Sequence, residues 1–197
     1  MINKRDIPTK CTFSLSQWKN NLNLTNYEKT KFETVLNQLD FQIKKSKRKE
    51  LQISVYGRVG VGKSSLLNAL IEKQVFPTDI LNGNTKATKS YTWDKRFNSL
   101  NKVHLIDSPG IDEINNTKKE EINFNYILNT DLILFVIDSD INRIELNYIE
   151  ELLRHNKPIL LVLNRCDQWD AKETKLILSS IHRKLSFCEQ KIKIALV

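Results

Sequence analysis

The stretch that decides the fold runs Gly57-Arg58-Val59-Gly60-Val61-Gly62-Lys63-Ser64. It fits the pattern Gly-x-x-x-x-Gly-Lys-[Ser/Thr], in which a glycine-rich turn points successive backbone N–H groups at one anion. The aliphatic run of residues 51–56 before it predicts a strand, and residues 65–71 after it predict a helix. Because a helix N-terminus adds partial positive charge, the stretch predicts a phosphate-binding loop between a strand and a helix.

The residues of this loop have separate expected roles toward a nucleotide. We expect the backbone from Gly57 to Ser65 to hold the phosphates and Lys63 to neutralise the β- and γ-phosphates as a catalytic group. The Ser64 hydroxyl is expected to coordinate Mg²⁺. This pattern alone does not separate ATP from GTP.

Further short apolar runs follow, separated by segments with helical spacing. The expected strands are residues 51–56, 102–106, 131–137, 159–163 and 191–197, with residues 90–97 as a more polar strand at an edge. Such alternation predicts an α/β fold with a mostly parallel sheet and helices on both faces. In these sheets ligands bind at the carboxyl ends of the strands, where the motifs of this chain fall.

A second motif, Asp107-Ser108-Pro109-Gly110, ends the expected strand of residues 102–106. Asp107 can hold Mg²⁺, and the Gly110 backbone N–H can approach a γ-phosphate because no side chain blocks it. Taken alone the four residues also make a good turn, but with the phosphate loop they favour the metal interpretation.

A polar loop of residues 82–88 lies between these two motifs. One threonine there is expected to coordinate Mg²⁺ only when a γ-phosphate is present. We assign this catalytic and metal role to Thr85, with Thr88 as the alternative.

The third motif, Asn164-Arg165-Cys166-Asp167, follows the apolar run of residues 160–163. A carboxylate at Asp167 can accept hydrogen bonds from guanine N1–H and the 2-amino group together, a match that adenine does not offer. We expect Asn164 to brace the loop and reach the base, and the aliphatic part of Arg165 to cover the ring.

The three motifs together resemble the P-loop GTPases of the translation-factor-related class, especially the Era-like and dynamin-like groups, over about residues 51–197. The resemblance implies a P-loop NTPase three-layer sandwich with a six-stranded sheet, GTP or GDP with Mg²⁺ as ligands, and GTP hydrolysis. Residues 62–70 are similar to the Era-type opening. Gly83-Asn84-Thr85-Lys86 is similar to a Gly-Thr-Thr-Arg context of that group, which supports Thr85.

Three residues depart from the family pattern. Ile111 stands where Ras-like members place a water-orienting Gln, Gly60 stands where potassium-activated relatives carry Asn, and Arg165 replaces the usual Lys. The leading hypothesis is therefore a GTP switch with slow hydrolysis that involves Lys63 and Gly110. In place of the missing Gln, hydrolysis is expected to rely on another group, on a dimer or on an activating protein. A nucleotide-binding scaffold with little hydrolysis is the alternative, and an ATPase would require another interpretation of the third motif.

Residues 1–50 are expected to form an extension, and residues 51–197 the G domain. Met1 to Asn23 has little periodicity and predicts a loosely packed lead-in, whereas Thr25 and Glu28 predict a capping box that opens one amphipathic helix of about residues 28–45. The basic run Lys44–Lys49 is expected to link this helix to the first strand. Contact of the run with anionic lipid or RNA is one interpretation, and a solvated helix end and linker is the other.

The whole chain has 31 Lys and Arg against 23 Asp and Glu, for a net charge of +8. Its three cysteines lack metal-ligand spacing, and its N-terminus lacks the apolar block of a secretory signal, so we expect a protein of the cytoplasm or the plastid stroma with possible peripheral membrane contact. The family's fifth motif, a loop after the last strand, is expected beyond Val197, so the G domain is expected to be truncated there.

Overall fold

The computed structural model describes residues 7–78, 88–95, 100–111, 117–186 and 192–197. Its contacts divide the chain into two units, each described by itself. Residues 1–51 with residues 94–103 are called the helical unit, and residues 52–93 with residues 104–197 are called the sheet unit.

The sheet has six strands, the number expected from the sequence, in the order β2-β3-β1-β4-β5-β6. The strands are β1 Glu50–Tyr56, β2 Lys89–Trp93, β3 Lys102–Asp107, β4 Leu132–Ile137, β5 Ile159–Leu163 and β6 Lys193–Leu196. Strands β1, β4, β5 and β6 run parallel to one another. The polar strand β2 lies at the edge of the sheet, as predicted, but it ends at Trp93, earlier than the predicted range of residues 90–97, of which residues 96 and 97 lie outside the described residues.

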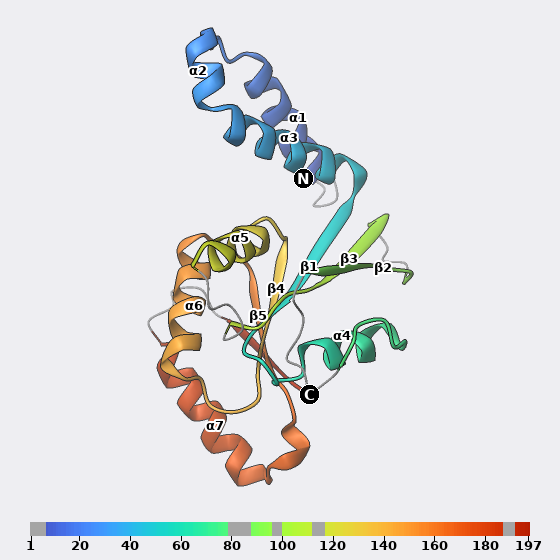
Figure 1. The fold of residues 1–197 in the computed structure, drawn as a ribbon, viewed down its shortest axis with the longest axis vertical. Coiled ribbons are helices and arrows are strands. Elements are labelled where there is room, and N and C mark those ends of the chain that lie inside the picture. The colour runs from blue at the N-terminus through green and yellow to red at the C-terminus, as the bar shows by residue number, and fades with distance from the viewer. Residues whose placement is uncertain (1–6, 79–87, 96–99, 112–116, 187–191) are drawn as a thin grey trace. The chain divides into compact units, whose positions relative to one another are not determined.

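Strand β4 lies in the middle of the sheet because it is apolar on both faces. Every residue from Ile133 to Ile137 is buried, and β1 and β5 flank the strand on its two sides (Figure 1). Phe135 pairs in register with Tyr56 of β1 and Leu161 of β5. A parallel strand covered on both faces requires this continuous apolar run, which is the signal that the sequence showed.

Four helices cover the sheet within the sheet unit: α4 Lys63–Ile71, α5 Thr117–Leu128, α6 Arg143–Arg154 and α7 Ala171–Lys184. Helix α4 lies on the opposite side of the sheet from α5 and α6 (Figure 1). The main core cluster joins Tyr56 and Phe135 of the sheet to Ile127 of α5, Ile149 of α6 and Ile181 of α7. Strand β1, which leads into the phosphate loop, also contributes to this core, so the packing of the core holds the end of that strand in place.

The first correction concerns the lead-in predicted for Met1 to Asn23. Residues Ile7–Asn20 form a helix, α1, which packs on α3 Glu33–Arg48 through polar side chains. Thr12 hydrogen-bonds Ser46 over 2.9 Å between the two hydroxyls, and Lys19 pairs with Asp40. Because polar residues form this packing face, the face lacks the apolar spacing by which a packed helix is normally recognised in a sequence.

The second correction concerns the single helix predicted for about residues 28–45. Two helices are present, α2 Asn26–Lys31 and α3, separated by Phe32 with φ −101° and ψ 8°. The predicted capping box is confirmed, since the Thr25 backbone N–H donates to Glu28 Oε2 at 2.9 Å and Glu28 N–H donates to Thr25 Oγ1 at 3.3 Å. The Thr25 backbone N–H, and then the Thr25 hydroxyl, which donates to the same Glu28 Oε2 at 2.7 Å, hold the pKa of Glu28 below its usual value.

The basic run is also placed differently from the prediction, because residues 44–48 belong to α3 rather than to a linker. Lys49 then ends the helix in the left-handed conformation, with φ 56°. Lys45 is buried, and its ammonium lies 5.8 Å from the centre of the Phe41 ring. Within the described ranges no helix is both long enough and apolar enough to cross a membrane.

Candidate nucleotide site

The phosphate loop joins the end of β1 to the start of α4. Gly62 caps α4 with φ +92°, and a Cβ at this position would lie 2.3 Å from Asn164 Nδ2. The backbone conformation and the close approach both require glycine. The sequence motif thus marks a turn in which the loop passes directly against the third motif.

Lys63 and Ser64 are the first two residues of α4. Lys63 is 8% exposed, and its Nζ donates to the Arg58 carbonyl oxygen at 2.6 Å, so the side chain folds back across the loop. Ser64 Oγ donates to Asp107 Oδ2 at 2.6 Å. This second contact brings the first and second motifs together with two oxygen ligands side by side, the ligand type that Mg²⁺ prefers.

Asp107 is the last residue of β3 and is fully buried. The turn after it is fixed to β1, because Ser108 Oγ donates to the Val55 carbonyl oxygen at 2.6 Å. Gly110 lies against the phosphate loop, where a Cβ would come within 2.6 Å of Val59 Cγ2. Gly110 therefore lies beside the loop that is expected to hold the phosphates, and its role toward a γ-phosphate stays a prediction.

Ile111, the residue in place of the water-orienting Gln, is 7% exposed and belongs to the main core cluster. Its backbone N–H donates to the Gly57 carbonyl oxygen at 3.1 Å, which ties the second motif to the start of the phosphate loop. The side chain thus stabilises the loop by packing and brings no polar atom to a phosphate.

The third motif is held against the phosphate loop by two side chains. Asn164 Nδ2 donates to the Val61 carbonyl oxygen at 2.9 Å, which is the bracing contact expected of it. Arg165 has φ 62°, its Nη2 donates to the Gly60 carbonyl oxygen at 2.7 Å, and its Nη1 lies 3.4 Å from Asp138 Oδ2. The guanidinium therefore links three loops, a geometry that the planar fork of Arg allows and a Lys ammonium does not match.

Asp167 lies in a short 3₁₀ helix, Cys166–Gln168, and is exposed. The start of this helix is tied to the end of the last strand, since Cys166 N–H donates to the Val197 carbonyl oxygen at 2.9 Å. The carboxylate assigned to base recognition is therefore on an ordered turn beside the phosphate loop and open to solvent.

Thr85, the preferred switch threonine, lies outside the described residues, and its role stays a prediction. Thr88 is described and half-buried. Sequence reasoning missed Asp138 and Ser108, which support Arg165 and Asp107. Asp138 follows the apolar run of β4 directly, so the strand-end rule that found the other residues could have found it.

A phosphate loop, a Ser–Asp pair suited to Mg²⁺ and an Asn-x-x-Asp turn meet at the carboxyl ends of parallel strands. This arrangement defines a P-loop nucleotide-binding protein with the base reader of a GTPase.

Comparison with known proteins gives the particular family. The family model described as 50S ribosome-binding GTPase matches residues 52–165, and the chain belongs to that family. GTPase Der of Campylobacter fetus is 36% identical over 120 residues, which cover 59% of this chain and 25% of that protein. The tRNA modification GTPase MnmE of Helicobacter acinonychis is 34% identical over 159 residues, covering 77% of this chain and 34% of that protein.

A solved structure supports the Era-like assignment of the G domain. The crystal structure of a point variant of Aquifex aeolicus Era bound to GDP·AlF4⁻ matches with a TM-score of 0.62 and 25% identity, covering 76% of this chain and 51% of that chain. The present chain spans only a quarter to a third of the length of the two GTPases compared above. The part that this chain shares with these proteins is thus the GTP-binding G domain.

Proposed function

We propose that the protein is a Mg²⁺-dependent GTP switch whose own hydrolysis is slow. The observation that carries this proposal is the 2.6 Å hydrogen bond between Ser64 Oγ and Asp107 Oδ2, because it unites the two motifs that bind metal and phosphate in one site. The clamp of Asn164 and Arg165 on the phosphate loop adds the base reader to the same site.

In this proposal, different residues bind the phosphates, the guanine base and the metal ion. Lys63 and the backbone N–H groups of the loop hold the β- and γ-phosphates, and Asp167 accepts from the guanine base. Ser64 and Asp107 would hold Mg²⁺, which supplies positive charge to the phosphates when bound. Thr85 joins them only with a γ-phosphate present.

Slow hydrolysis follows from the position of Ile111. Its side chain is apolar and packed in the core, so it does not orient the attacking water. The Gly110 N–H and Lys63 still stabilise charge on the γ-phosphate, which leaves a basal rate that a dimer partner or an activating protein can raise. We place this switch in the cytoplasm or the plastid stroma.

Nucleotide competition tests the guanine specificity. GDP is expected to displace a fluorescent guanine nucleotide at far lower concentration than ADP does, and equal displacement would count against a base reader at residues 164–167. In Asp167→Asn, an amide donor faces the two donors of guanine, so GDP affinity should fall about 100-fold, or about 2.7 kcal/mol, while XDP binds better. Unchanged GDP affinity in this variant would refute the assignment of Asp167.

A phosphate-release assay at saturating GTP tests the enzyme against the second candidate, a nucleotide-binding scaffold, which the buried Ile111 favours. Slow turnover that needs Mg²⁺ and is lost in Lys63→Ala is the expected result. GTP binding without turnover above buffer would favour the scaffold.

A further inference from the structure

The described side chains of the helical unit bury little apolar surface, and polar side chains join two of its helices. Helix α1 packs on α3 through the Thr12–Ser46 hydrogen bond and the Lys19–Asp40 ion pair. Of the described side chains in α1, α2 and α3, Ile43 is the one apolar residue that is buried. The unit therefore hides little apolar surface within itself.

A stripe of apolar residues runs along α1 next to the row of polar residues that contacts α3. Cys11, Leu15 and Trp18 follow one another at i, i+4 and i+7, and all three are exposed, Leu15 to 45% and Trp18 to 55%. Other large apolar side chains of the unit are exposed as well: Phe13, Tyr27, Phe32, Val35 and Phe41. The stripe on α1 and these further exposed apolar side chains make the helical unit a candidate interaction surface.

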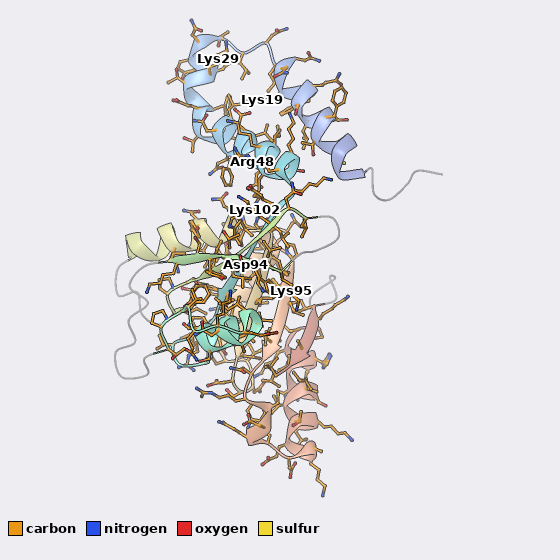
Figure 2. The ribbon with its side chains drawn as sticks, turned by 90° about the vertical axis from the view of Figure 1, so that its right-hand side faces the viewer. Lys19, Lys29, Arg48, Asp94, Lys95 and Lys102 are labelled. Atoms are coloured by element: carbon orange, nitrogen blue, oxygen red, sulfur yellow. The ribbon has the colours of Figure 1, made fainter. Side chains whose placement is uncertain are left out.

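The net charge of the chain belongs entirely to this unit. The helical unit contains 14 Lys and Arg against 6 Asp and Glu, a net charge of +8, whereas the sheet unit contains 17 of each and is neutral. Among the exposed cations are Lys29, Lys31, Lys44, Lys47, Arg48 and Lys49, and Figure 2 labels Lys29 and Arg48 on α2 and α3. The partner of this surface must therefore be anionic.

We propose that the helical unit binds the surface of an anionic lipid bilayer. Trp18 and Leu15 insert at the level of the headgroups, and the lysines of α2 and α3 attract anionic lipids. RNA is the other anionic partner, and the exposed aromatic rings suit base stacking, but the exposed aliphatic side chains Leu15 and Val35 do not, and the cations are mostly Lys rather than Arg. A bilayer uses both the aliphatic and the aromatic side chains.

This inference is independent of the nucleotide site. The stripe and the cations lie in the helical unit, and every residue assigned to the nucleotide lies in the sheet unit. GTP binding can hold while lipid binding fails, or the reverse, so measurements on one protein sample distinguish the two failures.

Vesicle flotation with the full chain tests the proposal. We expect vesicles of phosphatidylcholine with about one third phosphatidylglycerol to bind the protein at least about tenfold more tightly than phosphatidylcholine alone. Raising salt from about 0.1 M to about 1 M should weaken the binding, because the Debye length shortens from about 10 Å to about 3 Å. Equal binding to both kinds of vesicle, or to neither, overturns the proposal.

Matched variants locate the surface. The double variant Leu15→Gln with Trp18→Gln should lose at least about tenfold in vesicle affinity and keep its GDP affinity. The control is Ile144→Gln with Leu176→Gln, which alters apolar residues exposed to 52% and 71% in the sheet unit and should change neither. If circular dichroism shows that the Leu15→Gln, Trp18→Gln variant has lost helix, the charge-reversal variant Lys44→Glu with Lys47→Glu replaces it. This second variant should also lose vesicle binding.

An RNA arm completes the test. Fluorescence anisotropy with single-stranded and duplex RNA of about 20 nucleotides should show weaker binding than the anionic vesicles do. Tight RNA binding without vesicle binding would overturn the lipid assignment in favour of a nucleic acid. Full vesicle binding by the Leu15→Gln, Trp18→Gln variant would overturn the assignment of the stripe.

Discussion

The two units of this chain distribute apolar and charged residues in opposite ways. The sheet unit buries a continuous apolar core, balances its charges and exposes the polar residues of its nucleotide site. The helical unit joins α1 to α3 by polar contacts, exposes apolar side chains and carries the whole net charge. The buried apolar core stabilises the sheet unit without a partner. The exposed apolar side chains and the positive charge of the helical unit suit a surface that a partner covers.

The largest expected effect follows from removing a core side chain of the sheet unit. Phe135 is fully buried in the central strand and packs edge-on against Tyr56, with 5.9 Å between the ring centroids. Phe135→Ala leaves a cavity between sheet and helices and should lower the free energy of unfolding by about 3–5 kcal/mol. Urea denaturation followed by circular dichroism measures the loss.

Phe41→Ala is the matched control, because this Phe of the helical unit is 49% exposed. We expect it to change the free energy of unfolding by less than about 1 kcal/mol, most of it from lost contact with Lys45. If the two variants are equally destabilised, the contrast between a packed unit and an open unit is wrong.

The next effect concerns nucleotide affinity rather than folding. Lys63→Ala removes an ammonium from the phosphates and should weaken GTP binding about 30- to 100-fold, or about 2–3 kcal/mol. Its effect on the free energy of unfolding should stay below about 1 kcal/mol, because the variant gives up one hydrogen bond to the Arg58 carbonyl. Titration with GTP and thermal unfolding of the same sample measure both; a larger loss in folding than in binding would contradict the site.

The contrast between the units also explains which parts of the fold could be predicted. The strands of the sheet unit were found because each is an apolar run that a parallel sheet must bury, as in residues 132–137. Helix α1 was missed because Thr12 and Lys19, which contact α3, are polar, so the packing face of α1 shows no apolar period. The break at Phe32 was missed because it depends on one backbone conformation that Phe does not specify.

The site was more predictable than the helices because each motif residue follows a strand. Ser64, Asp107 and Asn164 were found from three motifs and their positions after strands, and the contacts of Ser64 with Asp107 and of Asn164 with the phosphate loop agree with their expected roles. The link from Arg165 to Asp138 joins residues from two different strand ends, and only the strand order β1-β4-β5 shows that these ends are neighbours. Such pairings depend on topology, which a linear pattern does not contain.

A smaller effect is expected from a charged cluster inside the sheet unit. Partial burial acts to raise the pKa of Asp140, but hydrogen bonds from Lys184 and Ser180 and the charge of Lys184 outweigh it and lower the pKa from 3.8. Because the pKa is lower in the folded state, the Asp140 carboxylate stabilises the fold at every pH above its pKa in the unfolded chain. This contribution is lost as the pH falls through its pKa in the folded protein. Because the pair is about one third exposed, Asp140→Asn should cost no more than about 1 kcal/mol at pH 7.

Unfolding measured across pH checks this sign. The difference between the wild-type protein and Asp140→Asn should be constant near neutral pH and shrink in acid, once Asp140 is protonated in both states. A difference that grows as pH falls would show that the carboxylate is destabilising in the folded protein.

The smallest effect is expected from the ion pair that joins α1 to α3. A double-mutant cycle with Lys19→Ala and Asp40→Ala should give a coupling energy of about 0.2–1 kcal/mol, because Asp40 is 40% exposed and solvent screens the pair. The exposed pair of Arg154 and Glu151 in α6 serves as the control and should give about 0.3–0.5 kcal/mol. Similar coupling energies for the two pairs would mean that the Lys19–Asp40 pair holds α1 no more firmly than an ordinary surface ion pair does. Exposed Trp18 can then move toward a partner at little cost in free energy. A coupling well above about 2 kcal/mol would instead show that polar contacts anchor α1 by themselves, and the contrast between the two units would then fail.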